Sequence, residues 1–142
     1  MAEPTNDTRS SILTQRFPRA VALLTGATFA ALGVWAMAAP HAFFDAVARF
    51  EPYNQHLLQD IGAFQIGLGL VLLLAAAAPR ADVLAMALIG VGTGAAFHLL
   101  SHLLGLDLGG NPPADIPTFT VMALLLLAAG AARWRAGRSA AH

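Results

Sequence analysis

The 142-residue sequence contains no cysteine and no lysine, and only 11% of its residues are charged. The absence of cysteine excludes disulfides, thiol redox chemistry and cysteine-ligated metal clusters. The charged fraction is less than half of the roughly 25% that is typical of soluble proteins. The formal net charge is zero and the arginines form no basic stripe, so nucleic acid is not an expected partner. No Ser-His-Asp, P-loop or dinucleotide-binding motif occurs, and we therefore predict no catalytic activity.

Apolar residues, by contrast, are abundant: they make up 57% of the chain, and the mean hydropathy is +0.64. They concentrate in four segments, at about 20–39, 61–78, 83–104 and 116–132. A helix needs about 20 residues to cross the hydrocarbon core of a bilayer, and only helices satisfy the backbone of such continuous segments in lipid. We predict an all-α, four-helix transmembrane bundle in contact with the lipid bilayer. Its single membrane domain covers 17–135, between a polar N-terminal tail, 1–16, and a C-terminal tail, 136–142.

The arginines predict the orientation of the bundle. Seven of the eight lie before the first span, between the second and third, or after the fourth, and only Arg49 lies elsewhere. Because short loops rich in arginine stay in the cytoplasm, both termini are expected there. The use of arginine for every basic residue, with abundant alanine, is typical of a GC-rich bacterial genome, so we expect a multi-pass protein of the inner membrane. Trp35 and Trp134 fall near opposite membrane surfaces, where tryptophan is enriched.

Two further features concern the N-terminal part. In the first outer loop, Phe43, Val47 and Phe50 follow helical spacing, which predicts a short helix lying in the membrane interface. Residues 1–38 also resemble a cleavable signal peptide, with Ala-Met-Ala at 36–38. The apolar stretch of about 20 residues is longer than the usual 7–15 of a signal core, which favours a retained first span.

The polar residues of the spans are expected to meet near the outer surface. His98 and His102 are four residues apart, on one face of the third span and close to its outer end. His56 and Asp60 have the same spacing at the outer start of the second span. Because ionisable groups facing lipid are costly, they should turn toward one another. The predicted polar cluster at the outer face consists of His56, Asp60, Gln65, His98, Ser101 and His102.

Small residues provide the packing that such a cluster requires. Gly26 and Gly33 share a stripe of the first span, Gly62 and Gly69 one of the second, and Gly94 lies in a similar stripe of the third. Such stripes let membrane helices approach closely. We expect these glycines to lie at helix–helix contacts.

The cluster permits several kinds of chemistry. Two neutral imidazoles at positions i and i+4 can chelate a divalent metal ion, with Asp60 as a third ligand beside His98 and His102. A quinone headgroup needs only hydrogen bonds and an apolar slot. Alternatively, the histidines serve as interhelical hydrogen-bonding groups without a ligand. A b-type haem is disfavoured because two histidines of one helix cannot occupy opposite faces of the iron.

Three stretches, AAPHAFFDAV, NQHLLQDIGAFQIGLGL and AAFHLLSHLLGLD, together resemble small four-span bacterial membrane proteins of the DoxX-like family, closest to uncharacterised actinobacterial-type members. The resemblance covers about 18–133, and its most specific parts are His56 with Asp60-x-Gly62-Ala63 and the histidine pair. It implies a four-helix membrane bundle without an established activity. Some DoxX proteins resemble quinone-linked sulfur-oxidation subunits, and others act as partner subunits in thiol-oxidative defence. The lack of cysteine argues against a thiol role here.

From these observations we expect a small integral membrane protein that binds a ligand or a partner at its polar cluster. A quinone- or metal-binding redox subunit is the first alternative, and a purely structural accessory subunit is the second. A membrane partner subunit or a homo-oligomer is compatible with each of them.

Overall fold

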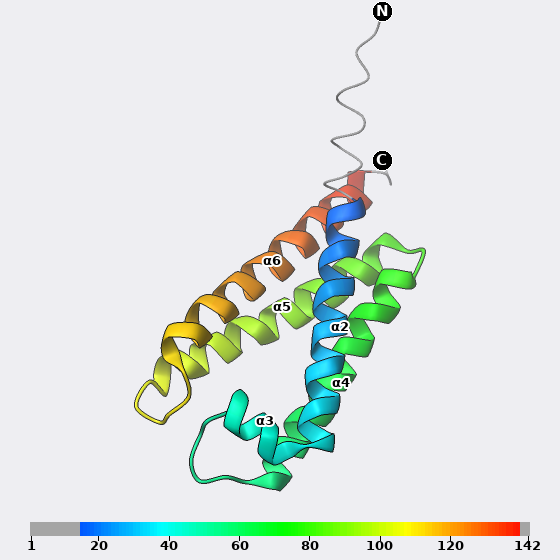
Figure 1. The fold of residues 1–142 in the computed structure, drawn as a ribbon. Coiled ribbons are helices and arrows are strands. Elements are labelled where there is room, and N and C mark those ends of the chain that lie inside the picture. Colours follow the sequence, from blue (N-terminus) through cyan, green and yellow to red (C-terminus); the bar gives the residue numbers. More distant parts are fainter. Residues whose placement is uncertain (1–14, 140–142) are drawn as a thin grey trace, which may run out of the picture.

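The computed structural model describes residues 15–139, and most of the predicted polar tails, 1–14 and 140–142, lies outside this part. The described chain is all-α and contains no strand (Figure 1). Its helices are α2 (Phe17–Ala38), α3 (Pro40–Ala46), α4 (Gln55–Ala77), α5 (Ala81–Leu104) and α6 (Pro112–Ser139). Four of them, α2, α4, α5 and α6, are long and apolar enough to cross a membrane. The predicted fold class, a four-helix membrane-type bundle, is confirmed.

All four long helices begin before their predicted apolar segments, α4 and α6 by the widest margin. Helix α4 begins at Gln55 because the side chain of Asn54 caps it, accepting a hydrogen bond from the Leu57 N–H at 3.1 Å. Helix α6 begins at Pro112, since two successive prolines are well suited to a first helical turn. It also continues to Ser139, so residues 136–139 of the predicted tail are helical.

Pro117 consequently lies inside α6 rather than at its start. A proline inside a helix removes one backbone hydrogen bond, and threonine side chains often compensate in membrane helices. Pro117 leaves the carbonyl of Pro113, in the first turn of α6, without its helical partner; the Thr120 hydroxyl donates instead to the carbonyl oxygen of Ile116 at 2.7 Å.

The four long helices form two tightly packed pairs, α2 with α4 and α5 with α6 (Figure 1). In the first pair, glycines face each other across the contact, Gly33 opposite Gly62 and Gly26 opposite Gly69. A Cβ atom at Gly33 would lie 2.5 Å from the Gly62 carbonyl oxygen, closer than real side chains come. The packing predicted for these four glycines is confirmed.

The second pair uses different glycines from those predicted. A Cβ at Gly94 would meet nothing within 4 Å, so the expectation that Gly94 packs against another helix is wrong. Gly92 instead lies against Leu126, and Gly130 lies against Ile89, which brings α5 and α6 together. The packed face of α5 is therefore not the predicted one. The face with Gly92 turns toward α6, and the face with Gly94 does not.

The two pairs share a core only over part of their length. The larger cluster of buried residues takes members from all four long helices, including Ala22, Leu72, Leu88 and Leu126. A smaller cluster, Ala36, Phe43 and Leu58, belongs to α2, α3 and α4 alone. The pairs converge at the end where α2 begins and α6 ends, and they diverge toward the opposite end (Figure 1). We call these the terminal end and the loop end.

At the loop end, α3 and the segment after it connect the two pairs. The predicted short helix is present as α3, and Phe43 packs inward on the smaller core cluster rather than along a free face. Val47 and Phe50 follow the end of the helix. The Arg49 carbonyl accepts a hydrogen bond from the Gly110 N–H at 3.1 Å, which ties this segment to the loop between α5 and α6.

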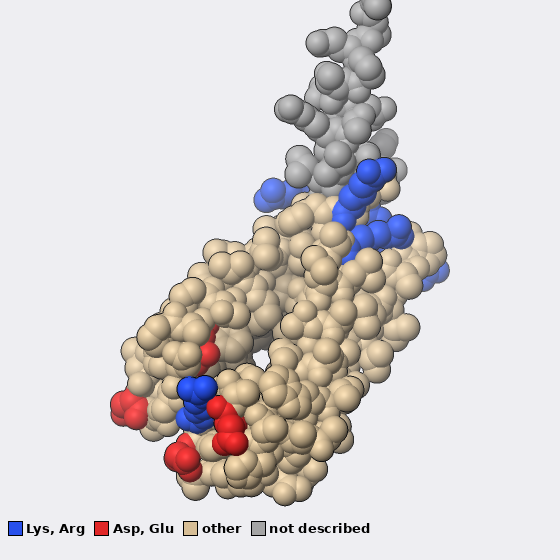
Figure 2. All heavy atoms as spheres, in the orientation of Figure 1, with Lys and Arg blue, Asp and Glu red and all other residues tan. Residues whose placement is uncertain are grey.

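The surface matches the composition. Large apolar side chains are exposed along every long helix, including Leu24, Phe64, Phe97 and Leu124. On the face drawn in Figure 2, arginines gather at the terminal end, and the visible acidic side chains lie toward the loop end with a single basic group. Figure 2 also shows an opening between the two helix pairs close to the loop end. A bilayer is the medium that such an apolar circumference requires.

Candidate functional site

The histidine pair lies in the last two turns of α5. The Nε2 atoms of His98 and His102 are 3.1 Å apart, and the ring centroids are separated by 4.9 Å. At this distance one ring donates a hydrogen bond through Nε2–H and the other accepts it. The spacing of four residues alone produces this geometry, since such residues lie above one another on a helix.

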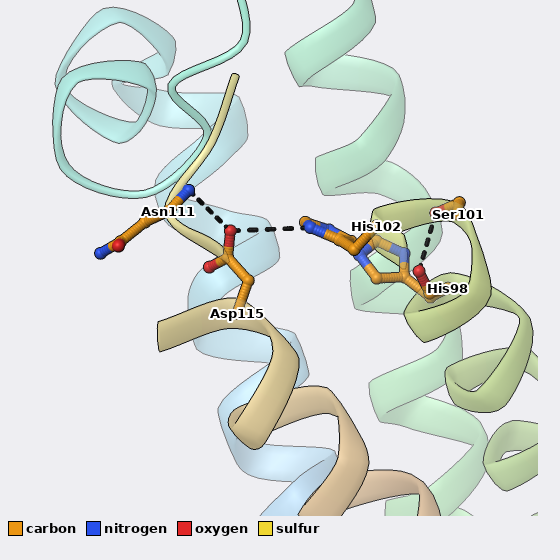
Figure 3. A network of polar contacts seen from close by, with 5 residues as sticks. All are labelled: His98, Ser101, His102, Asn111 and Asp115. Atoms are coloured by element: carbon orange, nitrogen blue, oxygen red, sulfur yellow. Dashed lines mark hydrogen bonds and ion pairs between the residues drawn. The ribbon is translucent and has the colours of Figure 1, made fainter. Parts of the chain in front are cut away.

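A carboxylate from α6 lies on the other side of His102 (Figure 3). Asp115 Oδ2 is 3.6 Å from His102 Nδ1, an ion-pair distance, and it also accepts a hydrogen bond from the Asn111 N–H at 2.9 Å. The side chains of His102 and Asp115 are only 14% and 21% exposed. The order along the network is therefore Asn111, Asp115, His102 and His98.

The turn before α6 places this carboxylate. Gly109 and Gly110 have φ angles of 116° and 82°, a backbone conformation that glycine adopts without strain. The chain then reverses into α6, and the Asp115 N–H donates to the Asn111 carbonyl oxygen at 2.8 Å. Asp115 thus faces back toward α5 from the first turn of α6.

Two phenylalanine rings contact the histidine pair. The Phe119 ring centroid lies 4.4 Å from that of His98 and 4.7 Å from that of His102. The Phe50 ring lies 5.6 Å from His102 with an interplanar angle of 73°. Phe119 comes from α6, one turn after Asp115, whereas Phe50 comes from the segment between α3 and α4. These two rings and Asp115 leave the His102 side chain only 14% exposed, whereas His98 stays exposed.

The other predicted site residues do not join this network in the described structure. His56 and Asp60 pair with each other on α4 at 3.5 Å, with side chains 87% and 53% exposed. The Ser101 hydroxyl donates to the His98 carbonyl oxygen at 2.7 Å, so it caps the backbone rather than serving the rings (Figure 3). The carboxylate next to the histidine pair is Asp115, not Asp60.

Gln65 lies deeper in α4. Its Oε1 atom is buried and has no hydrogen-bond partner in the described structure. An unsatisfied buried acceptor costs about 1–3 kcal/mol. Within the predicted cluster, Gln65 is thus the residue whose buried side-chain oxygen has no hydrogen-bond partner in the described structure.

Among residues 15–139, no three histidine or acidic side chains converge in a way that could hold a metal ion. The predicted set of His98, His102 and Asp60 is therefore not assembled, and the two histidines stand as a pair. The pair can supply two ligands to a metal ion, and Asp115 lies next to one of the two, His102.

An apolar pocket of about 460 Å³ opens between α2 and α6. Its walls are Thr25, Pro117, Thr118, Val121, Met122 and Leu125. The α6 residues of the wall flank Phe119 in sequence, so the pocket begins at the same level of α6 as Phe119.

Sequence analysis missed Asp115 and Phe119 as site residues. The available signal was the pair of prolines before Asp115: taken as a helix start, they place Asp115 in the first turn and Phe119 one turn later on the same face. Phe50 has no comparable signal, because its contact depends on the path of an irregular segment.

Comparison of the chain with protein-family models, with curated proteins and with solved structures finds no match.

Proposed function

We propose that the protein is a membrane-embedded binding protein that holds a small ligand by its hydrogen-bonding headgroup on the His98–His102 pair. The observation that carries this proposal is the arrangement around His102. One ring nitrogen faces Asp115, the other faces His98, and the Phe119 ring lies against both imidazoles. His56 and Asp60 pair only with each other in the described structure, and the His56 side chain is 87% exposed.

The polar contacts along Asp115, His102 and His98 give the site a defined polarity. When His102 Nδ1 carries the hydrogen that faces Asp115, its Nε2 accepts from the Nε2–H of His98. The lone pair of His98 Nδ1 is then the acceptor left for a ligand. The reduced, quinol form of a quinone headgroup suits this site, because its hydroxyl can donate to that lone pair while its apolar ring packs on the phenylalanine surfaces.

A divalent metal ion is the second candidate ligand, and a separate observation supports it. Two bonds of 2.0–2.1 Å at a tetrahedral zinc ion hold the two nitrogens roughly 3.4 Å apart, close to the 3.1 Å between the Nε2 atoms. A ligating histidine usually has a carboxylate at its other nitrogen, the place that Asp115 takes at His102. Two protein ligands would leave the remaining positions for water or a ligand.

The proposed location is the inner membrane of a bacterium, with both termini in the cytoplasm. The gathering of arginines at the terminal end supports this orientation. The site at the loop end then opens toward the outer face. Membership of the DoxX-like family, and assembly with a membrane partner subunit or a second copy, stay proposals that rest on the sequence motifs.

Calorimetric titration of the detergent-purified full chain tests these candidates. A short-chain benzoquinol, kept reduced, and Zn²⁺ are titrated separately into the wild type, His98→Ala and the matched variant His56→Ala. We expect one of the two probes to bind with a stoichiometry of one, to lose binding in His98→Ala and to keep it in His56→Ala. Binding of neither probe, or equal binding in both variants, contradicts the proposal and leaves the histidines as interhelical hydrogen-bonding groups.

A further inference from the structure

A second pocket lies at the terminal end of the bundle, far from the histidine pair along α5 and α6. It has a volume of about 470 Å³ and lies where α5 begins and α6 ends. Its lining residues are Arg80, Ala81, Asp82, Arg133, Trp134, Gly137 and Arg138. The two helices meet closely there, since a Cβ at Gly137 would lie 3.5 Å from the Cβ of Ala81.

The charge of this pocket is strongly positive. Three arginines line it and only one acidic residue, Asp82, does. Asp82 Oδ1 accepts a hydrogen bond from the Val83 N–H at 3.0 Å, and its single negative charge offsets only one of the three arginine charges. Arginine binds phosphate through paired N–H groups with a geometry that lysine cannot match. The pocket therefore suits a phosphate-bearing anion.

The depth of the pocket indicates the source of that anion. In α6, no charged residue separates Asp115 from Arg133, and in α5 none follows Asp82. The pocket thus begins where the apolar part of both helices ends. Trp134 is exposed at this level, and tryptophan is enriched where headgroups meet acyl chains. A lipid headgroup is present at this depth in any bilayer that the helices cross.

We propose that this pocket binds the phosphodiester headgroup of an anionic phospholipid. The arginines contact the phosphate, while Trp134 and Ala81 provide apolar surface for the glycerol and the first acyl carbons. Basic pockets between membrane helices bind anionic headgroups in this manner. The site is independent of the function proposed for the histidine pair and goes beyond it.

Tryptophan fluorescence gives a direct test, because the chain has two tryptophans and one of them lines the pocket. Trp35→Phe leaves Trp134 as the only reporter. This variant, in nonionic detergent, is titrated with phosphatidylglycerol or phosphatidylcholine that carries brominated, fluorescence-quenching acyl chains. We expect phosphatidylglycerol to quench Trp134 at a much lower mole ratio than phosphatidylcholine.

The arginine variants assign that preference to the pocket. A basic residue near an anionic surface contributes about 1 kcal/mol, which corresponds to about a fivefold change. Arg80→Gln with Arg138→Gln should raise the phosphatidylglycerol midpoint roughly 30-fold, and Arg138→Gln alone about fivefold. Arg19→Gln removes the same charge at the terminal end without lining the pocket, and its midpoint should not change. Circular dichroism verifies that each variant keeps its helices, and Arg138→Lys should recover part of the loss.

Three results would overturn the proposal. Equal midpoints for the two lipids show that the charge of the headgroup is not recognised. A midpoint in Arg19→Gln that moves as far as in the double variant shows general surface attraction instead of a pocket. Relief of quenching by millimolar inorganic phosphate identifies a site for a free anion, not for a lipid.

Discussion

His102 and Asp115 face each other across the α5–α6 pair, with Nδ1 and Oδ2 3.6 Å apart and both side chains largely enclosed. The Asn111 N–H holds the same carboxylate oxygen from the opposite side at 2.9 Å. The Asn111 N–H therefore fixes the direction of the carboxylate, and the carboxylate in turn orients the ring of His102. The properties of the histidine pair should depend on this one acidic side chain.

Asp115→Asn should weaken binding of the probe that the wild type accepts. An amide keeps the shape but loses the negative charge that orients the imidazole, and changes of this kind reduce metal affinity about 10–100-fold. Calorimetry with the same probe measures the effect. Asp60→Asn is the matched control, because Asp60 pairs only with exposed His56 in the described structure. Equal losses in both variants would contradict the role given to Asp115.

Chemical modification should distinguish the histidines without any ligand. The side chain of His56 is 87% exposed and that of His102 is 14% exposed. Diethylpyrocarbonate should therefore modify His56 well before His102, as followed by peptide mass spectrometry. Phe50→Ala removes the ring that covers His102 and should raise the modification rate of His102 but not of His56. Unchanged protection in Phe50→Ala would show that this ring does not shield the site.

Gln65→Leu should raise the thermal stability of the ligand-free protein. Removing a buried acceptor without a partner relieves a penalty of about 1–3 kcal/mol, and Oε1 is such an acceptor in the described structure. Thermal unfolding in detergent measures the shift, with Gln55→Leu at the exposed start of α4 as control. A loss of stability would mean that the amide makes a favourable contact in the folded protein.

Gly69→Ala should separate α2 from α4. The new Cβ would lie 2.7 Å from the Gly26 carbonyl oxygen and 2.8 Å from the Ala30 nitrogen, so backbone has to move, at a loss of about 1–3 kcal/mol. Gly67→Ala, on the same helix, meets nothing within 4 Å and should not lower the midpoint of thermal unfolding. Because alanine has the higher helix propensity, a similar loss for both would contradict the role given to close packing at Gly69.

The sequence predicts the fold because length and hydropathy determine membrane-type helices almost independently of tertiary structure. It also predicts the contact of His98 with His102, which one helical turn produces. It could not show which spans pair, since helices that are apolar on nearly every side carry no stripe that marks the packed face. The glycines at 26, 33, 62 and 69 were the exception, because the absence of side chains marks a face directly.

The sequence places Asp60 in the site only because it lies at the same depth in the membrane as the histidine pair. Depth does not determine the direction in which a residue faces around its helix axis. In the structure Asp60 pairs with His56 on its own helix, while Asp115 reaches the histidines because α5 and α6 pack together. That choice depends on tertiary contacts. The early start of α6 was also needed, and it follows from the two prolines that precede Asp115.

The position of Phe50 has a consequence for the whole bundle. The imidazoles are carried by the α5–α6 half, whereas the ring over His102 arrives with the α2–α4 half, across the end where the halves share no buried core. The cover over His102 is thus shared between the two halves of the bundle. A change that moved the halves apart would take the Phe50 ring away from His102.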